Sequence, residues 1–128
     1  MKLIVGGAYQ GKAAYGISVG LIREGQMAEG ADCTLEALFS CQCMNHFHLW
    51  VKRALQAGWD LERLPERLLG ENPGVVLITD ELGCGIVPMD AFDREYRERH
   101  GRLCCRLAAR AQQVHRVACG IGTVIKDG

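Results

Sequence analysis

The amino-acid sequence predicts an α/β fold in which helices cover a mostly parallel sheet, giving three layers. Short apolar strands alternate with helical segments along the chain. The run Val75–Thr79 is continuously apolar, as in a strand that is covered on both faces. A glycine-rich turn joins the first apolar run to the first helical segment, as in ligand-binding βα units. With 128 residues, the chain can bury a core, and we expect residues 1–128 to form a single domain.

The first half of the chain is predicted to begin with a strand and a helix. Its expected segments are a strand at Leu3–Val5, a helix from about Gly11 to Arg23, a loop at Gly25–Ala31, a short helix at Cys33–Phe39 and a weak strand at Cys41–Asn45. Gly16 and Gly20 each weaken the first helix by about 1 kcal/mol relative to alanine. Asp32 or Thr34 is the expected cap of the short helix.

The second half contains the clearest strand and the longest helix. Its expected segments are an amphipathic helix at His48–Ala57, a helical stretch at Leu61–Leu69, a strand at Val75–Thr79, a long helix from about Asp90 to Gln113 and a strand at Val114–Cys119 ending in Gly120-Ile121-Gly122. Leu49, Val51 and Leu55 are the expected apolar positions of the amphipathic helix, and Gly58 ends it. Pro65 is expected to disturb the next helix.

The glycine-rich turn has the GxxxxGK pattern of a phosphate-binding loop. Its residues are Gly6, Gly7, Ala8, Tyr9, Gln10, Gly11, Lys12 and Ala13. Backbone N–H groups of such a loop and of the first turn of the following helix hold phosphate oxygens, and the lysine reaches the terminal phosphates. The alternative is an ordinary strand-to-helix turn. Ala13 stands where the pattern has a serine or threonine that binds Mg²⁺. The pattern therefore predicts a P-loop-like fold that binds GTP or ATP.

Two carboxylates follow the most apolar strand. Asp80 and Glu81 stand where P-loop proteins hold Mg²⁺ or polarise water, so both are candidate ligands of Mg²⁺. Successive side chains of a strand point to opposite faces, and we therefore expect only one of the two to face the site. The alternative is a pair of solvated carboxylates at a strand end.

A histidine cluster, Asn45-His46-Phe47-His48, lies between a weak strand and a helix. Histidine titrates near neutral pH and serves as a base, a nucleophile or a ligand. His46 and His48 are therefore candidates for a catalytic base or a phosphate contact, and the alternative is capping or packing. Four glycine-bearing or polar segments follow predicted strands and are expected at one sheet edge: Gly6–Lys12, Asn45–His48, Asp80–Gly85 and Gly120–Gly122.

Composition excludes several classes of partner. Basic and acidic residues number 15 each, which gives no electrostatic argument for nucleic acid or an anionic membrane. No apolar stretch reaches the roughly 20 residues that a membrane span needs, and the first residues lack the features of a signal peptide. The seven cysteines are an odd number without paired CxxC spacing. We expect free thiols in the cytoplasm, the alternative being metal or redox chemistry. The mixed charges of Arg94–Arg102 indicate a solvated helix face, the alternative being a phosphate contact.

Three segments resemble the adenosylcobinamide kinase/adenosylcobinamide-phosphate guanylyltransferase family of cobalamin biosynthesis. The first is the glycine loop, which is similar to the family's GGAxSGKS-like beginning. The others are Ile78-Thr79-Asp80-Glu81-Leu82-Gly83-Cys84-Gly85-Ile86-Val87-Pro88, then Gly101-Arg102-Leu103-Cys104-Cys105-Arg106-Leu107-Ala108 with Cys119-Gly120-Ile121. The resemblance implies a mostly parallel sheet, a homo-oligomer and two transferase activities. One phosphorylates the aminopropanol arm of adenosylcobinamide, and the other transfers GMP from GTP onto that phosphate through a guanylylated histidine.

The chain also departs from the family's pattern. It is shorter between the first helix and the second motif, and the stretch it lacks carries the guanylylated histidine. Asn45 loosely aligns with a strand-end carboxylate, and Asp80 stands where asparagine is more common. We expect a nucleotide-dependent transferase acting on a corrinoid. In it Lys12 binds phosphates, Glu81 with Asp80 holds Mg²⁺ or orients the acceptor hydroxyl, and His46 or His48 contributes to catalysis. The alternative is a catalytically degenerate nucleotide-binding or regulatory member.

Overall fold

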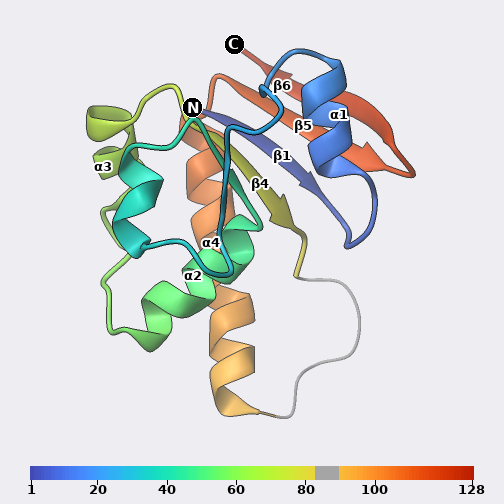
Figure 1. Ribbon diagram of the computed structural model, residues 1–128. Helices are drawn as coiled ribbons and strands as arrows, with labels where there is room; N and C mark the ends of the chain where they lie inside the picture. Colours follow the sequence, from blue (N-terminus) through green and yellow to red (C-terminus); the bar gives the residue numbers. More distant parts are fainter. Residues whose placement is uncertain (83–89) are drawn as a thin grey trace.

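A computed structural model describes residues 1–82 and 90–128, and in it the chain forms a six-stranded sheet in the order β2-β3-β4-β1-β5-β6. Figure 1 shows the elements, which are β1 (Lys2–Gly6), α1 (Lys12–Ser18), β2 (Met27–Glu29), a 3₁₀ helix η1 (Leu35–Phe39), β3 (Cys43–Asn45), α2 (Phe47–Gln56), α3 (Leu64–Glu71), β4 (Val76–Asp80), α4 (Ala91–Arg110), β5 (Gln113–Ala118) and β6 (Ile121–Asp127). The first five strands in this spatial order pair in parallel, and β6 pairs antiparallel with β5. The predicted fold class is confirmed.

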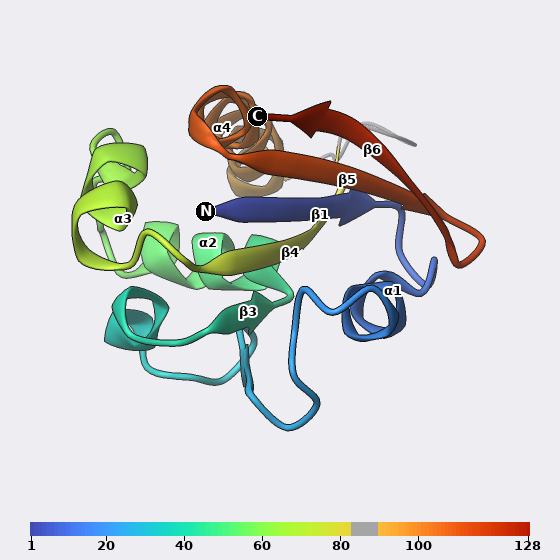
Figure 2. The ribbon, with the colours of Figure 1, turned by 90° about the horizontal axis from the view of Figure 1, so that it is seen from above.

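Two apolar clusters cover the two faces of this sheet. Figure 2 shows the sheet running from β3 through β4, β1 and β5 to β6. On one face, Leu3 and Leu77 pack with residues of α2, α3 and α4. On the other face, Ile4 and Ile78 pack with residues of α1 and the segment that follows it. Because β1 and β4 are covered on both faces, they form the centre of the sheet, and their carboxyl ends open at one edge.

The first helix is shorter than predicted, and the predicted loop after it contains a strand. Helix α1 ends at Ser18 rather than near Arg23, and Gly20 follows in the left-handed region with φ +79°. Glycine takes this conformation readily, so it stops the helix. Within the predicted loop Gly25–Ala31, residues Met27–Glu29 form β2, which pairs with Cys43–Asn45.

The predicted apolar face of the amphipathic helix was partly wrong. In α2 the buried apolar residues are Phe47, Trp50, Val51 and Ala54, whereas Leu49 and Leu55 are only partly buried. Their spacing of three and four residues is the pattern of a helix face, and it includes both aromatic side chains.

One prediction about a helix end was wrong, and another was confirmed in part. Pro65 lies in the first turn of α3 and begins that helix rather than disturbing it, because the missing N–H of proline is not needed there. The short segment Leu35–Phe39 is a 3₁₀ helix, and Thr34 is its N-cap residue as expected, although the Thr34 side chain makes no cap hydrogen bond. Helix α4, by contrast, is capped by the Asp90 side chain, which accepts from the N–H groups of Phe92 and Asp93.

The last strand was not predicted. Strands β5 and β6 are joined by Cys119 and Gly120, which both have positive φ (+52° and +76°), as the two-residue turn of a tight hairpin requires. A side chain at Gly122 would overlap the Tyr15 ring, so β6 lies closely against α1. Strand β6, at the edge of the sheet, therefore packs against α1, the helix that follows the glycine loop.

The structure describes six of the seven cysteines, and all six are free. Within residues 1–82 and 90–128, no helix has the length and apolar character needed to cross a membrane. The segment Gly83–Pro88, which carries part of the family resemblance, lies outside the described residues.

Candidate functional site

A pocket of about 390 Å³ opens at the carboxyl ends of β1, β3 and β4. It is lined by the glycine loop and the start of α1 on one side and by the strand-to-helix junction of α2 and the end of β4 on the other. The lining residues are Ala8, Tyr9, Gln10, Gly11, Lys12, Ala13, Ala14, Asn45, His46, His48, Leu49, Ile78 and Asp80. The sheet therefore brings together residues from three of the four segments that the sequence places at strand ends, with Asp80 as the contribution of the third, because parallel strands end at the same edge.

The fourth strand-end segment supports the loop from behind. Gln10 accepts two hydrogen bonds from the β5–β6 turn, from the Gly120 N–H to its carbonyl (2.8 Å) and from the Cys119 N–H to its side-chain oxygen (2.5 Å). Gly11 has φ +81°, a backbone conformation that residues with a side chain rarely adopt. A side chain at Gly6 would overlap the Val117 carbonyl oxygen. The conformation at Gly11 and the close approach at Gly6 explain why glycine is required at these two positions.

Lys12 is buried inside the pocket with its ammonium group paired. Its Nζ donates to the Gly7 carbonyl oxygen and forms an ion pair with Asp80 Oδ1, both at 2.7 Å. Its side chain is only 8% exposed, and that of Asp80 is 19% exposed. The lysine thus points back into its own loop, where the phosphates of a nucleotide would lie in a GxxxxGK site.

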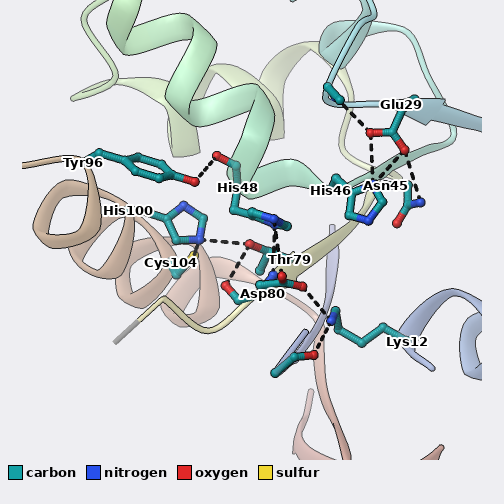
Figure 3. A network of polar contacts seen from close by, with 12 residues as sticks. Lys12, Glu29, Asn45, His46, His48, Thr79, Asp80, Tyr96, His100 and Cys104 are labelled. Atoms are coloured by element: carbon teal, nitrogen blue, oxygen red, sulfur yellow. Dashed lines mark hydrogen bonds and ion pairs between the residues drawn. The ribbon is translucent and has the colours of Figure 1, made fainter. Parts of the chain in front are cut away.

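Asp80 also contacts the first turn of α2. Its backbone N–H donates to His48 Nδ1 at 3.1 Å, and its Oδ2 lies 3.4 Å from His48 Nε2. Since Nδ1 accepts a hydrogen bond, the hydrogen of the neutral ring is on Nε2, facing the carboxylate. Burial lowers the pKa of His48, so the ring is neutral at pH 7. His48 and Lys12 are therefore both fixed by one carboxylate (Figure 3).

His46 lies at the rim of the same pocket in an unusual backbone conformation. It immediately precedes α2 with φ +50°, and its ring centre is 5.7 Å from that of His48, nearly perpendicular to it. Its Nδ1 contacts both carboxylate oxygens of Glu29, at 2.8 and 3.0 Å. Sequence reasoning missed Glu29, because it assigned residues 25–31 to a loop. The strand-end rule places Glu29 at the pocket only once Met27–Glu29 is known to be a strand, and the three partly buried residues of that run give no strand pattern.

Two buried polar side chains of α4, Tyr96 and His100, contact residues next to the pocket. The Tyr96 hydroxyl donates to the His48 carbonyl oxygen at 2.6 Å. His100 is 2% exposed, and its Nε2 lies 2.9 Å from Thr79 Oγ1 and 3.3 Å from Cys104 Sγ. Burial lowers the pKa of His100 to about 4. The Nδ1 of His100 is buried and has no hydrogen-bond partner among the described residues.

Glu81 lies outside the pocket lining. Its side chain pairs with Arg116, with Oε1 3.3 Å from the arginine Nε, and its backbone N–H donates to the Gly6 carbonyl oxygen at 2.9 Å. Asp80 continues the face of Val76 and Ile78, which packs toward α1. The two carboxylates therefore point in opposite directions, as expected from the pleat of a strand, and Asp80 is the one in the pocket.

The charged segment of α4 forms ion pairs with its own helix. Arg99 pairs with Glu95 and Arg102 with Glu98, each four residues apart and well exposed. These two arginines do not line the pocket, in agreement with the expectation of a solvated helix face.

The residues present fit Mg²⁺ only in part. Asp80 supplies one carboxylate, and Ala13 supplies no hydroxyl group. Among residues 1–82 and 90–128, no three His, Cys, Asp or Glu side chains are arranged to hold a metal ion. Proteins often bind Mg²⁺ through one or two carboxylates plus water and substrate phosphates. Asp80 Oδ2, the carboxylate oxygen more distant from its nitrogen partner, fits that arrangement when a nucleotide supplies the other oxygens.

Comparison with known proteins identifies relatives of this chain. Its sequence is 50% identical over 52 residues to the bifunctional adenosylcobalamin biosynthesis protein CobU of Salmonella typhimurium, and 48% identical over 52 residues to the protein of that name from Escherichia coli. Each match covers 41% of this chain and 29% of the relative, so less than a third of each relative is represented.

A family model extends the likeness along most of the chain. The model for cobinamide kinase / cobinamide phosphate guanyltransferase matches residues 34–125. This range includes the histidine cluster, Asp80, α4 and most of the β5–β6 hairpin, and it begins after the glycine loop. Because the matched range is more than two thirds of the chain, the chain belongs to the cobinamide kinase / cobinamide phosphate guanyltransferase family.

Proposed function

We propose that this chain is a nucleotide-dependent transferase of the cobinamide kinase / cobinamide phosphate guanyltransferase type, with a corrinoid as the acceptor substrate. The observation that carries the proposal is the shared pocket, in which the GxxxxGK loop, Lys12 and the strand-end carboxylate Asp80 face one another. The family match and the names of the two relatives support the class of acceptor.

In this proposal the pocket binds the phosphates of GTP or ATP. The loop from Gly6 to Ala13 surrounds the phosphates, and the Lys12 ammonium turns from Asp80 toward them. Asp80 then becomes available to hold Mg²⁺, which neutralises phosphate charge when it is bound. His46 and His48 line the acceptor side of the pocket, and Glu81 orients Arg116 outside it.

Calorimetric titration tests nucleotide binding. We expect GTP or ATP to bind in the micromolar to millimolar range that is typical of substrates, both with and without Mg²⁺. A Lys12→Ala variant should bind about 10- to 100-fold more weakly, because a charged hydrogen bond contributes roughly 1.5–3 kcal/mol. Lys52→Ala is the matched control, because Lys52 is also a lysine paired with an aspartate but lies on α2 outside the pocket. Its Nζ is 3.8 Å from Asp93 Oδ1. Absence of heat with both nucleotides contradicts the proposal.

A second candidate function is a nucleotide-binding or regulatory member that does not catalyse transfer. Ala13 favours it, because this position supplies no hydroxyl for Mg²⁺. Incubation with cobinamide, nucleotide and Mg²⁺ followed by mass spectrometry distinguishes the two functions. A phosphorylated corrinoid supports the transferase, whereas nucleotide binding without product supports the regulatory member.

Three further features of the chain are proposals of the same kind. We infer that residues 1–128 fold as one domain, that the protein forms a homo-oligomer, and that it works in the cytoplasm. The free cysteines support a reducing compartment, and the family resemblance supports the oligomer. Limited proteolysis, light scattering of the purified protein and cell fractionation test them in turn.

A further inference from the structure

The pocket contains two histidines, and their hydrogen bonds give them different chemistry. His46 Nδ1 contacts a carboxylate, which can only accept a hydrogen bond, so Nδ1 carries the hydrogen. In the neutral ring, Nε2 is then the unprotonated nitrogen. For His48 the opposite holds, because its Nδ1 accepts the Asp80 N–H and its Nε2 faces the Asp80 carboxylate. Among residues 1–82 and 90–128, nothing donates to the lone pair of His46 Nε2, whereas that of His48 Nδ1 accepts the Asp80 N–H.

The two histidine side chains also differ in their exposure to solvent. The His46 side chain is 46% exposed at the pocket rim, whereas that of His48 is 8% exposed. In Figure 3 the His46 ring lies between Glu29 and the Lys12–Asp80 pair. A substrate that enters the pocket therefore meets the His46 ring, while His48 belongs to the wall that positions Asp80.

Glu29 is held so that it can orient this ring. Its Oε2 accepts the Ala31 N–H at 2.9 Å, and its Oε1 lies 3.4 Å from the Asn45 amide nitrogen. The strand pairing of Glu29 with Asn45 places the carboxylate beside the residue that precedes His46. A side chain at Gly30 would overlap the His46 carbonyl oxygen, so this glycine permits the close approach of the two segments.

The backbone of His46 lies in the left-handed region, and hydrogen bonds to the first turn of α2 hold it there. A non-glycine residue with φ +50° is uncommon, and such residues gather at functional sites. The His46 carbonyl oxygen accepts hydrogen bonds from the N–H groups of Leu49 (2.9 Å) and Trp50 (3.3 Å), which anchor the residue to the first turn of α2.

We propose that His46 is the general base of phosphoryl transfer in this pocket and that Glu29 is its positioning residue. This inference rests on the proposed transferase function and specifies its acceptor as an alcohol. The acceptor oxygen forms a bond to the terminal phosphorus of the nucleotide, and the bond from that phosphorus to its bridging oxygen breaks. The nucleoside diphosphate leaves with the electron pair, and the hydroxyl proton moves to His46 Nε2. The Glu29 carboxylate stabilises the resulting imidazolium.

The first experiment examines the pair without substrate. Nitrogen NMR of the uniformly ¹⁵N-labelled protein, with the His46 signals assigned by their loss in His46→Ala, reports which ring nitrogen carries the hydrogen. We expect the Nδ1–H form in the wild-type protein and a shift toward Nε2–H in Glu29→Ala. Glu36→Ala is the control, because Glu36 is an exposed acidic residue of η1. An Nε2–H form in the wild type overturns the role of Glu29.

The second experiment measures turnover of cobinamide with GTP or ATP and Mg²⁺. We expect His46→Ala to bind nucleotide as the wild type does but to lose at least about 100-fold in kcat, with recovery on addition of imidazole. Glu29→Gln, whose amide oxygen still accepts from the Ala31 N–H, should lose about 10- to 100-fold in kcat, and Glu29→Asp should regain part of it.

The outcomes separate the two levels of the proposal. A wild-type protein without turnover refutes the transferase function, and the base assignment with it. An active wild type in which His46→Ala keeps its kcat, or loses only nucleotide affinity, refutes the base assignment alone. A covalent nucleotide or phosphoryl adduct on His46, seen by intact-protein mass spectrometry, overturns it in favour of a nucleophile.

Discussion

The ion pair between Lys12 and Asp80 predicts opposite effects on stability and on anion binding. In Asp80→Asn, the buried ammonium loses its carboxylate partner and keeps only neutral acceptors, the Gly7 carbonyl oxygen and the new amide oxygen. A charged hydrogen bond contributes roughly 1.5–3 kcal/mol, so we expect a loss of about 2 kcal/mol in the free energy of unfolding. For a chain of this length, roughly 4 °C per kcal/mol gives a fall of about 8 °C in Tm.

The same substitution should strengthen binding of nucleotide in the absence of Mg²⁺. The Asp80 carboxylate competes with phosphate for Lys12, and its negative charge also repels the phosphate. Two unit charges about 4 Å apart interact by roughly 4 kcal/mol at an effective dielectric constant of 20. Even if a third of this repulsion is realised, ATP or inorganic phosphate binds about tenfold more tightly. The anion then replaces the missing carboxylate, so it should raise the Tm of Asp80→Asn more than that of the wild type.

Differential scanning calorimetry with and without phosphate, in the presence of a chelator, measures both effects. The double variant Lys12→Met/Asp80→Asn completes a double-mutant cycle, and we expect a coupling free energy of about 1–2 kcal/mol between the two residues. The reasoning fails if Asp80→Asn is as stable as the wild type and gains no additional stabilisation from the anion. A coupling free energy near zero also refutes the reasoning, because it shows that the interaction between Lys12 and Asp80 does not contribute to stability.

Three other substitutions give predictions about the frame of the site. Gly30→Ala should lower Tm and reduce nucleotide turnover together, because a side chain there overlaps the His46 carbonyl oxygen; an unchanged Tm contradicts this contact. Tyr96→Phe should cost about 1–2 kcal/mol by urea denaturation, since it leaves the buried His48 carbonyl oxygen without that donor; an effect below about 0.3 kcal/mol would show that water replaces it. The pKa of His100 is about 4 in the folded protein and 6.5 in the unfolded chain. The stabilisation that comes from burying the neutral ring is therefore complete above pH 6.5 and is lost as the pH falls toward 4. This loss is about 3 kcal/mol, and urea denaturation of His100→Asn at several pH values should show a correspondingly flatter profile.

The central part of the fold could be predicted from the sequence because it depends on continuous burial. The strand that ends at Asp80 is apolar and buried from Val76 to Ile78, and Gly6 at the end of β1 stands where the Val117 carbonyl oxygen leaves no room for a side chain. The strand-end rule then placed Lys12, His46, His48 and Asp80 in one pocket without any knowledge of contacts. Which of Asp80 and Glu81 faces that pocket depends on the pleat, and the sequence left this open.

The edges of the sheet could not be predicted in the same way. All three residues of β2 are only partly buried, so pairing with β3 rather than a hydrophobic pattern makes it a strand. Strand β6 is largely exposed, with Ile121 at 73% and Ile125 at 58%, and its register comes from the turn at Cys119 and Gly120. Because Glu29 ends such an edge strand, its contact with His46 depends on tertiary structure that no local pattern records.

The hydrogen bonds from the β5–β6 turn to Gln10 couple local opening in two distant parts of the chain. The Cys119 and Gly120 amides both donate to Gln10 of the glycine loop, so local opening of the hairpin breaks contacts that support the loop. An anion bound by the loop should in turn stabilise the closed hairpin. Deuterium uptake at these two amides should therefore slow when a nucleotide is added. The turn would thus report occupancy of a pocket that it does not line.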